Sequence, residues 1–204
     1  MKRKILFFLF SWVTIPHILT YIFSKNKDVI TKDIVRWYEC AQIQEFRKSG
    51  GELVKLSWLL LRYKEFRNVF YLRVGKGNYW LYYLLPLTSL HIWTTSENVG
   101  AGLFIQHGYS TVIAAKEIGE NCWVNQQVTI GYNVSQRYGT GNPTLRDNVS
   151  VRAGAKVCGN ITIGSNSTIG LNAVVVKNVP EGSTVIPSPM MLITENGRRV
   201  YKKL

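Results

Sequence analysis

The chain has 204 residues, which suits one domain or a small domain with a helical extension, and its hydrophobic share of 46% can fill a sizeable core. The formal net charge of +13 favours acidic partners such as a phosphorylated cosubstrate, an anionic glycan or a membrane surface. Nucleic acid is not expected as a partner, because the sequence contains no recognisable nucleic-acid-binding motif. The three widely spaced cysteines, Cys40, Cys122 and Cys158, exclude a disulfide framework or a zinc pattern and predict reduced thiols in a cytoplasmic protein.

The chain begins with an uncharged stretch from Ile5 to Ser24 that follows three basic residues. The stretch is just long enough to cross a bilayer as a helix of about 20 residues. Pro16 and His17 in its middle argue against a span, and His17 is expected to be structural. We expect instead a helix that packs in a subunit interface or lies on the inner face of the membrane, so membrane contact through residues 1–24 is left open.

Residues 1–96 form a region that is predicted to be helical. A helix beginning near Asp28 or Thr31 is expected to run through Phe46, because its apolar residues recur at a spacing nearer 3.6 than 2. A second helix is predicted over residues 52–67, with its leucines on one side. The aromatic stretch that follows, residues 69–90, is interpreted as packing rather than as a base-stacking platform.

A repeat of six residues dominates the second half of the chain. Aliphatic residues recur at this interval before and after one break, at Ile118, Val124 and Ile130 and then at Leu145, Val151, Val157, Ile163, Ile169 and Val175. A period of six fits neither an amphipathic helix nor a simple strand, but it suits one short strand and one turn per repeat, with Gly or Asn at the turn. A β-sandwich would show longer and less even spacing. The expected core is therefore a stack of coils that share one interior.

The break in the repeat covers the polar and glycine-containing residues 132–142. We expect this insert to be a loop that projects from one corner of the stack, where loops often carry function. The predicted domains are then a helical region (1–96), a repeat domain (97–190) and a basic C-terminal tail (191–204).

Two segments of the repeat domain resemble a known family. They are Gly102-Leu103-Phe104-Ile105-Gln106-His107-Gly108, continued by Gln127-Val128-Thr129-Ile130-Gly131, and Val151-Arg152-Ala153-Gly154-Ala155-Lys156-Val157, continued through Ile169-Gly170 to Pro180. The pattern is similar to the catalytic domain of serine acetyltransferases and of related O-acetyltransferases from surface-polysaccharide pathways. The resemblance implies a mainly β fold, a left-handed parallel β-helix preceded by an α-helical N-terminal region. It also implies a homotrimer that binds acetyl-CoA between neighbouring prisms.

The resemblance assigns the general base to His107. A hydroxyl is a poor nucleophile at neutral pH, and a positioned base contributes roughly 10²- to 10⁴-fold to the rate. Histidine suits this task because its unperturbed pKa is about 6.5. Glu97 or a backbone carbonyl is expected to orient the ring. His91 stays unassigned.

The acceptor is less clearly indicated, because two positions depart from the serine acetyltransferase pattern. Gln106 replaces an aspartate before the base, and Asn142 replaces a second histidine before Pro143. Both are treated as acceptor-binding candidates. We therefore expect a sugar hydroxyl in surface-polysaccharide biosynthesis as acceptor, with serine O-acetylation as one alternative and a non-catalytic glycan-binding repeat protein as another.

The positions that match the family's acetyl-CoA groove are Gly131, Ala153, Gly170 and Lys177. Small residues would let the pantetheine arm approach, and a lysine would meet a phosphate; the alternative is that the Gly and Ala residues only form turns. No metal is expected, because a metal enzyme of the γ-class carbonic anhydrase kind needs about three histidines per ion and the repeat contains only His107.

Overall fold

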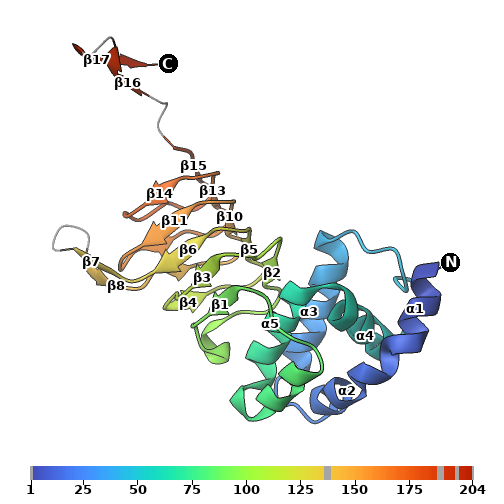
Figure 1. Cartoon of the computed structure of the whole chain (residues 1–204). Coiled ribbons are helices and arrows are strands. Elements are labelled where there is room, and N and C mark those ends of the chain that lie inside the picture. The colour runs from blue at the N-terminus through green and yellow to red at the C-terminus, as the bar shows by residue number, and fades with distance from the viewer. Residues whose placement is uncertain (1, 136–138, 188–190, 196–197, 204) are drawn as a thin grey trace.

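The computed structural model describes residues 2–135, 139–187, 191–195 and 198–203. A helical region at the N-terminal end is followed by a three-sided prism of short parallel strands (Figure 1). The helical elements are α1 (Lys2–Phe10), η1 (Ser11–Thr14), α2 (Ile15–Ile22), α3 (Lys27–Cys40), α4 (Glu52–Arg62), α5 (Lys64–Val74) and η2 (Lys76–Tyr83), with the short η3 (Ser96–Asn98) just before the prism.

The first predicted helix is shorter than expected. α3 ends at Cys40, and the continuation to Phe46 is wrong, because Gln42 and Phe46 adopt left-handed φ values of 51° and 58°. Ile43 and Phe46 are nevertheless buried. Their apolar spacing therefore reflects a turn that folds back onto the core, not a further turn of helix.

The second predicted helix is broken into two. Tyr63 is extended (φ −119°, ψ 102°) between α4 and α5, and α5 continues to Val74. The buried Arg67 side chain donates hydrogen bonds to the carbonyls of Leu60 (2.6 Å) and Leu61 (3.2 Å). These carbonyls belong to the last turn of α4, so Arg67 satisfies acceptors that a helix end leaves unpaired.

Three parallel sheets form the faces of the prism. The first face contains β1 (Leu90–Ile92), β3 (Thr111–Ile113), β6 (Thr129–Gly131), β11 (Lys156–Cys158) and β14 (Val174–Val175). The second contains β2 (Phe104–Ile105), β5 (Trp123–Val124), β10 (Ser150–Val151), β13 (Thr168–Ile169) and β15 (Thr184–Val185), and the third contains β4 (Glu117–Ile118), β9 (Thr144–Leu145) and β12 (Thr162–Ile163). The chain visits the second, first and third faces in turn, so each coil stacks on the previous one.

The six-residue repeat sets both the core and the corners. The repeated aliphatic residues, such as Val124, Val151 and Ile169, are fully buried inside the prism. Asn121 and Asn148 occupy the turn into the second face with φ values of 57° and 58°. Asparagine tolerates this left-handed conformation better than most residues, which confirms the predicted role of Asn at the turns.

The insert at residues 132–142 forms a projecting hairpin, as expected for a loop at one corner. β7 (Asn133–Ser135) pairs antiparallel with β8 (Gly139–Gly141) and leaves the prism after β6 (Figure 1). Gln136, Arg137 and Tyr138, which the prediction included, lie outside the described residues. Beyond the last coil, the predicted tail contains a second antiparallel hairpin, β16 (Met191–Glu195) and β17 (Arg198–Lys203).

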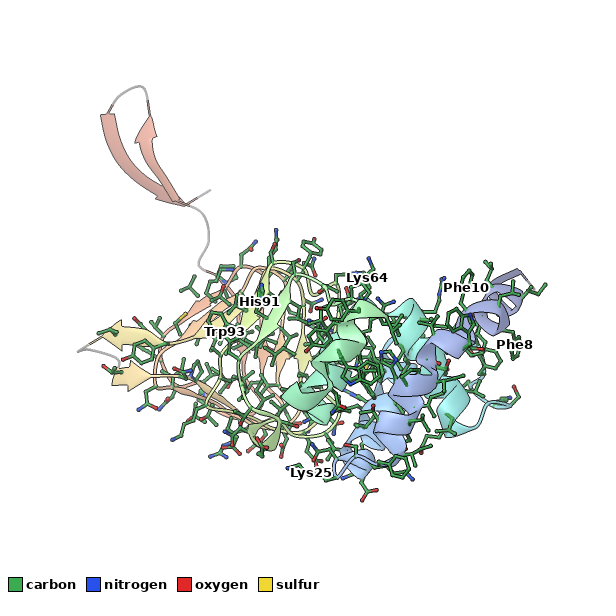
Figure 2. All side chains as sticks on the ribbon, turned by 60° about the horizontal axis from the view of Figure 1, so that its bottom comes forward. Phe8, Phe10, Lys25, Lys64, His91 and Trp93 are labelled. Carbon is green, nitrogen blue, oxygen red and sulfur yellow. The ribbon has the colours of Figure 1, made fainter. Side chains whose placement is uncertain are left out.

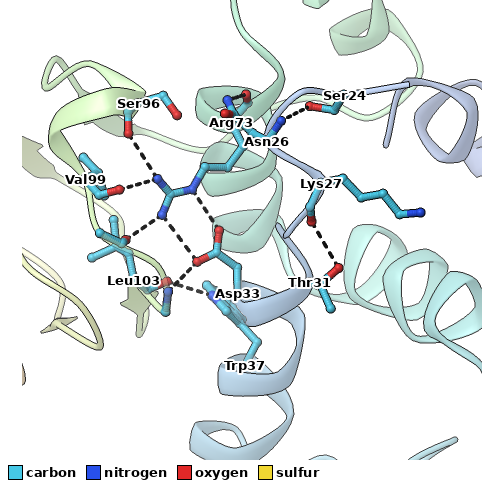
Figure 3. A network of polar contacts seen from close by, with 12 residues as sticks. Ser24, Asn26, Lys27, Thr31, Asp33, Trp37, Arg73, Ser96, Val99 and Leu103 are labelled. Atoms are coloured by element: carbon cyan, nitrogen blue, oxygen red, sulfur yellow. Dashed lines mark hydrogen bonds and ion pairs between the residues drawn. The ribbon is translucent and has the colours of Figure 1, made fainter. Parts of the chain in front are cut away.

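A buried ion pair joins the helices to the first coil of the prism (Figure 3). Arg73 donates to both carboxylate oxygens of Asp33 (2.9 and 3.4 Å), and also to the carbonyl oxygens of Ser96, Val99 and Gly100 (3.4, 2.6 and 2.7 Å). Asp33 accepts a further bond from the Gly102 amide at 2.6 Å. Burial raises the pKa of the Asp33 carboxyl, and the Arg73 charge and the Gly102 amide oppose that shift.

His17 is fully buried in the helical region, which confirms its structural role. Its Nε2 atom is hydrogen-bonded to the Tyr71 hydroxyl at 2.9 Å. Burial lowers the pKa of His17 from 6.5 to about 4, and the Arg67 charge adds to this while a backbone hydrogen bond at Val13 opposes it. The ring is therefore neutral in the folded protein at neutral pH.

We expect this buried ring to make the protein sensitive to acid. The unfolded chain binds the proton near pH 6.5 and the folded chain only near pH 4, so the stabilisation is complete above pH 6.5 and is lost as the pH falls to about 4. The loss should be on the order of 3 kcal/mol. Urea unfolding at about pH 7 and about pH 4 should show that the free energy of unfolding falls more in the wild type than in His17→Gln. Equal losses would mean that His17 does not titrate between these values.

Candidate active site

His107 lies at the corner where the second face turns into the first, between β2 and β3. Its side chain is exposed, and its backbone has a φ of 54° in the left-handed region. The Tyr109 amide donates a hydrogen bond to the His107 carbonyl at 2.7 Å, which closes the turn. Non-glycine residues in this conformation are uncommon and often occur at functional sites.

The residue after His107 allows a close approach of the helical region to this corner. A Cβ atom on Gly108 would lie 2.7 Å from Ile105 Cγ2 and 3.3 Å from Glu65 Cγ, so a larger residue cannot fit without movement. Glu65 belongs to the first turn of α5, next to Lys64, where the helices meet the prism (Figure 2). The structure thus places the Cγ atom of Glu65 close to Gly108, the residue that follows His107.

The next coil presents unpaired polar atoms at the same corner. Strand pairing of β2 with β5 aligns Gln106 with Asn125, and Asn125 Nδ2 donates to Gln106 Oε1 at 3.0 Å. Asn125 Oδ1 and Gln126 Oε1 are buried and have no hydrogen-bond partner among the described residues. Buried polar atoms are nearly always paired in native proteins, so these two oxygens stand out as unsatisfied acceptors in the coil next to His107.

Asn142 lies at a different corner, where the first face turns into the third. Its Nδ2 atom donates to the Ala114 carbonyl at 2.7 Å. Beside it is an open groove of about 570 Å³ beneath the β7–β8 hairpin, lined among others by Trp93, Thr95, Lys116 and Asn160. Among the described residues, no Asp or Glu lines this groove.

The four candidate acetyl-CoA residues divide between these two corners. Ala153 and Gly170 follow β10 and β13 and so lie on the His107 corner, whereas Gly131 and Lys177 lie on the Asn142 corner. Gly170 is required by the prism itself, because a Cβ there would lie 2.8 Å from the Val185 carbonyl oxygen. No atom lies within 4 Å of a Cβ built on Gly131, so packing does not explain that glycine.

One chain therefore aligns His107, Ala153 and Gly170 along one edge of the prism, in different coils. The width of the first face separates this edge from Asn142, Gly131 and Lys177. His91 lies on that face, in β1, and is exposed. Glu97 lines a cavity of about 370 Å³ with Arg73 and Lys25, not the His107 corner. Within the described part of the chain, no three His, Cys, Asp or Glu side chains gather as metal ligands would.

Sequence reasoning missed Glu65, Asn125 and Gln126 as members of the His107 corner. Glu65 is 42 positions before His107 in the sequence (107 minus 65), and no motif links the two. Asn125 and Gln126 follow β5 at a corner of the repeat, where polar residues are common and carry no functional signal. Only the stacking of the coils and the docking of α5 show that these side chains share one corner.

The comparisons with known proteins identify similar sequences and folds. No protein-family model matches the chain. A serine acetyltransferase from Staphylococcus xylosus is 45% identical over 105 residues (51% of this chain, 48% of that protein), and one from Bacillus pumilus is 39% identical over 110 residues (53% and 50%). The chain thus spans about half the length of these curated relatives.

Solved structures extend the similarity into the helical region. Serine acetyltransferase isoform 3 of Entamoeba histolytica, in complex with cysteine, matches 83% of this chain and 61% of its own, with 30% identity and a TM-score of 0.58. The Neisseria gonorrhoeae enzyme, in complex with serine, matches 80% and 67%, with 27% identity and a TM-score of 0.58. These neighbours and the parallel topology confirm the predicted fold, a left-handed parallel β-helix after an α-helical N-terminal region. In sequence and in fold, the chain is serine acetyltransferase-like.

Proposed function

We propose that this protein is an acetyl-CoA-dependent O-acetyltransferase in which His107 is the general base. The acceptor hydroxyl attacks the thioester carbonyl, an O–C bond forms, and the C–S bond to coenzyme A breaks. His107 takes the hydroxyl proton as attack proceeds and returns it to the departing thiolate, so no covalent enzyme intermediate is needed. The observation that carries this proposal is the exposed His107 side chain, presented by a left-handed turn at the corner between the second and first faces.

We further propose that Glu65 positions the His107 ring. Its side chain lies against Gly108, within one peptide of the base. A carboxylate beside an imidazole fixes its tautomer and favours the protonated form that arises during the reaction. This role replaces the earlier expectation for Glu97, which lies in another cavity.

The complete site is proposed to form between two chains of a homotrimer. His107 and Asn142 lie on opposite edges of the first face, so a single chain cannot bring both to one substrate. Packing the edge of one prism against the opposite edge of the next would combine Ala153 of one chain with Gly131 and Lys177 of its neighbour. Acetyl-CoA would then lie in the groove between them.

L-serine is the acceptor that the comparisons favour. The relatives reported above are serine acetyltransferases, and one similar structure is a complex with serine. Serine acetylation needs no change in the role of His107. It does require that the chain hold the amino-acid ammonium and carboxylate with residues other than the aspartate and histidine that Gln106 and Asn142 replace.

A sugar hydroxyl, as in surface-polysaccharide biosynthesis, is the second candidate, and the Asn142 groove favours it. The groove combines the Trp93 side chain with hydrogen-bonding residues such as Asn142 and Asn160 and with one cation, Lys116. No carboxylate that could hold an ammonium group lines it among the described residues. Trp93 is 70% exposed, so its ring face is available to an apolar ring surface. The groove therefore offers a sugar a ring contact and several hydrogen-bonding partners, whereas it offers an amino acid a partner for its carboxylate only.

The acceptor is tested by product analysis. Purified protein is incubated with acetyl-CoA and, separately, with L-serine and with nucleotide-linked and lipid-linked sugars, and the acetylated product is identified by mass spectrometry. Acetylserine would assign serine and would show that Gln106 and Asn142 are compatible with it. An acetylated sugar would assign the second candidate. Binding of glycans without acetylation of any acceptor would contradict the enzyme proposal and favour a non-catalytic glycan-binding protein.

The proposed acetyl-CoA groove gives a further prediction. Ala153→Leu should raise the KM for acetyl-CoA at least about tenfold, because the added side chain projects at the edge where the pantetheine arm would pass. Glu120→Leu is the matched control, since Glu120 is exposed at the corner that no proposed groove uses. Equal KM values in the wild type and Ala153→Leu would exclude this path for the cosubstrate.

We also propose a cytoplasmic location. The three cysteines are free thiols, and Cys122 is buried and donates to the Arg146 carbonyl at 3.2 Å. Unpaired cysteines are typical of a reducing compartment, where acetyl-CoA is available.

A further inference from the structure

The N-terminal helical stretch, which comprises α1, η1 and α2, exposes an extensive apolar surface. Residues Ile5–Ile22 form a helical stretch long enough and apolar enough to cross a membrane, yet only 22% of the stretch is buried. Its large exposed side chains surround most of α1 and continue at spacings of three and four residues through α2: Ile5, Leu6, Phe8, Leu9, Phe10, Trp12, Ile15, Leu19 and Ile22. Phe8 and Phe10 project at the outer end of the helical region, away from the prism (Figure 2).

The opposite side of the same stretch is fixed to the protein body. Thr14 is hydrogen-bonded to the Ser57 hydroxyl at 2.7 Å and His17 to the Tyr71 hydroxyl at 2.9 Å, and all four side chains are buried. If the stretch crossed a membrane, these polar groups would lose their hydrogen-bond partners and enter the hydrocarbon core, which costs free energy. The stretch is therefore suited to lie along a surface, not to cross a bilayer.

An additional apolar hollow lies beside this stretch. An open groove of about 320 Å³ separates α1 and η1 from α4 and is lined mostly by apolar side chains, among them Phe8, Trp12, Ile15 and Leu53. Aromatic residues of this kind are enriched where a helix meets the headgroup region of a bilayer.

The charges around this surface select its partner. Residues 1–27 contain five basic residues, Lys2, Arg3, Lys4, Lys25 and Lys27, and no Asp or Glu. A second copy docked on the same surface would bring two such basic sets together without acidic partners in these segments. An anionic lipid surface would instead neutralise them while it accepts the apolar side chains.

We propose that the exposed side of α1 and α2 binds the surface of an anionic lipid bilayer. The apolar side chains enter the boundary between headgroups and acyl chains, and Lys25 and Lys27 meet lipid phosphates or carboxylates. The prism then points away from the membrane, because it lies at the other end of the molecule (Figure 1). This inference does not depend on the proposed acetyltransferase activity.

The test is co-sedimentation of the full chain with two kinds of vesicle, pure phosphatidylcholine and equal parts of phosphatidylcholine and phosphatidylserine. We expect binding to the anionic vesicles that weakens with added salt. Phe8→Ser with Trp12→Ser should lower the partition coefficient at least about tenfold, and Lys25→Gln with Lys27→Gln by about the same factor. Val134→Ser with Ile186→Ser is the matched control, because these apolar side chains are at least as exposed but lie outside the helical region, on the β7–β8 hairpin and after β15.

Three results would overturn the inference. They are absence of binding to anionic vesicles, an equal loss of binding in the control, and a complex that resists extraction by alkaline carbonate, which would indicate a membrane span. Sedimentation equilibrium of the wild type and the same variants without lipid measures whether the apolar surface binds a second copy of the chain. A self-association that Phe8→Ser with Trp12→Ser abolishes, without vesicle binding by the wild type, would assign the surface to a second copy.

Discussion

Replacement of His107 by alanine is expected to lower the rate of acetyl transfer by roughly 10²- to 10⁴-fold, the usual contribution of a positioned general base. The loss should appear in kcat and in kcat/KM, because the base acts in the transition state. The KM for acetyl-CoA should change little, since the proposed groove residues remain. Stability should also be retained, because the His107 side chain is exposed and no core contact is removed.

His91→Ala is the matched control for this variant. His91 is also an exposed histidine on the first coils of the prism, but it lies on the first face and not at the corner. Its replacement should leave the rate within about threefold of the wild type, which corresponds to less than 1 kcal/mol. If His91→Ala lowered the rate of acetyl transfer more than His107→Ala, His91 and not His107 would be assigned as the base.

Replacement of Asp33 by leucine is expected to destabilise the protein by about 3–5 kcal/mol, because it leaves the Arg73 charge buried without its partner. Both side chains are 1% exposed, so water cannot replace the lost interaction. The effect should extend to the junction between helices and prism. Arg73 also holds the Val99 and Gly100 carbonyls, and Asp33 holds the Gly102 amide.

Urea unfolding measures the decrease in the free energy of unfolding. Two further variants show whether the buried ion pair is its cause. Asp33→Leu combined with Arg73→Leu should be less destabilised than the sum of the single variants, since no unpaired charge remains. Glu120→Gln breaks the exposed pair with Lys32 (3.9 Å) and should cost less than about 1 kcal/mol. If Asp33→Leu costs no more than Glu120→Gln, the buried pair does not hold the two parts together.

The prism could be predicted from the sequence because its repeat is local and strict. Each coil uses the same six-residue unit, so Val124, Val151 and Ile169 reveal their burial by spacing alone. The left-handed turns at Asn121 and Asn148 need a residue that tolerates positive φ, and such residues are recognisable in a sequence.

For the N-terminal region, the sequence predicts that helices form but not where each helix begins and ends. Ile43 and Phe46 continue the apolar spacing of α3 although the helix has already ended at Cys40. The break at Tyr63 has no glycine or proline to announce it. It is stabilised by Arg67, whose guanidinium satisfies the carbonyls at the end of α4, and such a tertiary contact leaves no periodic signal.

The candidate site was only partly visible in the sequence. His107 stands out because its motif is contiguous in the sequence. Glu65 reaches the same corner from a helix, and the unpaired oxygen of Asn125 is recognised only once its burial is known. The separation of His107 from Asn142 by the first face likewise follows from the coil order and cannot be read from a motif.

The most direct test is the release of free thiol from acetyl-CoA by wild-type protein and by His107→Ala, with and without a hydroxyl acceptor. The proposed mechanism predicts acceptor-dependent thiol release by the wild type and its near-complete loss in His107→Ala. Equal release by both proteins would contradict His107 as the base. No release by the wild type with serine or any sugar, although both proteins are folded, would contradict acetyl transfer as the function.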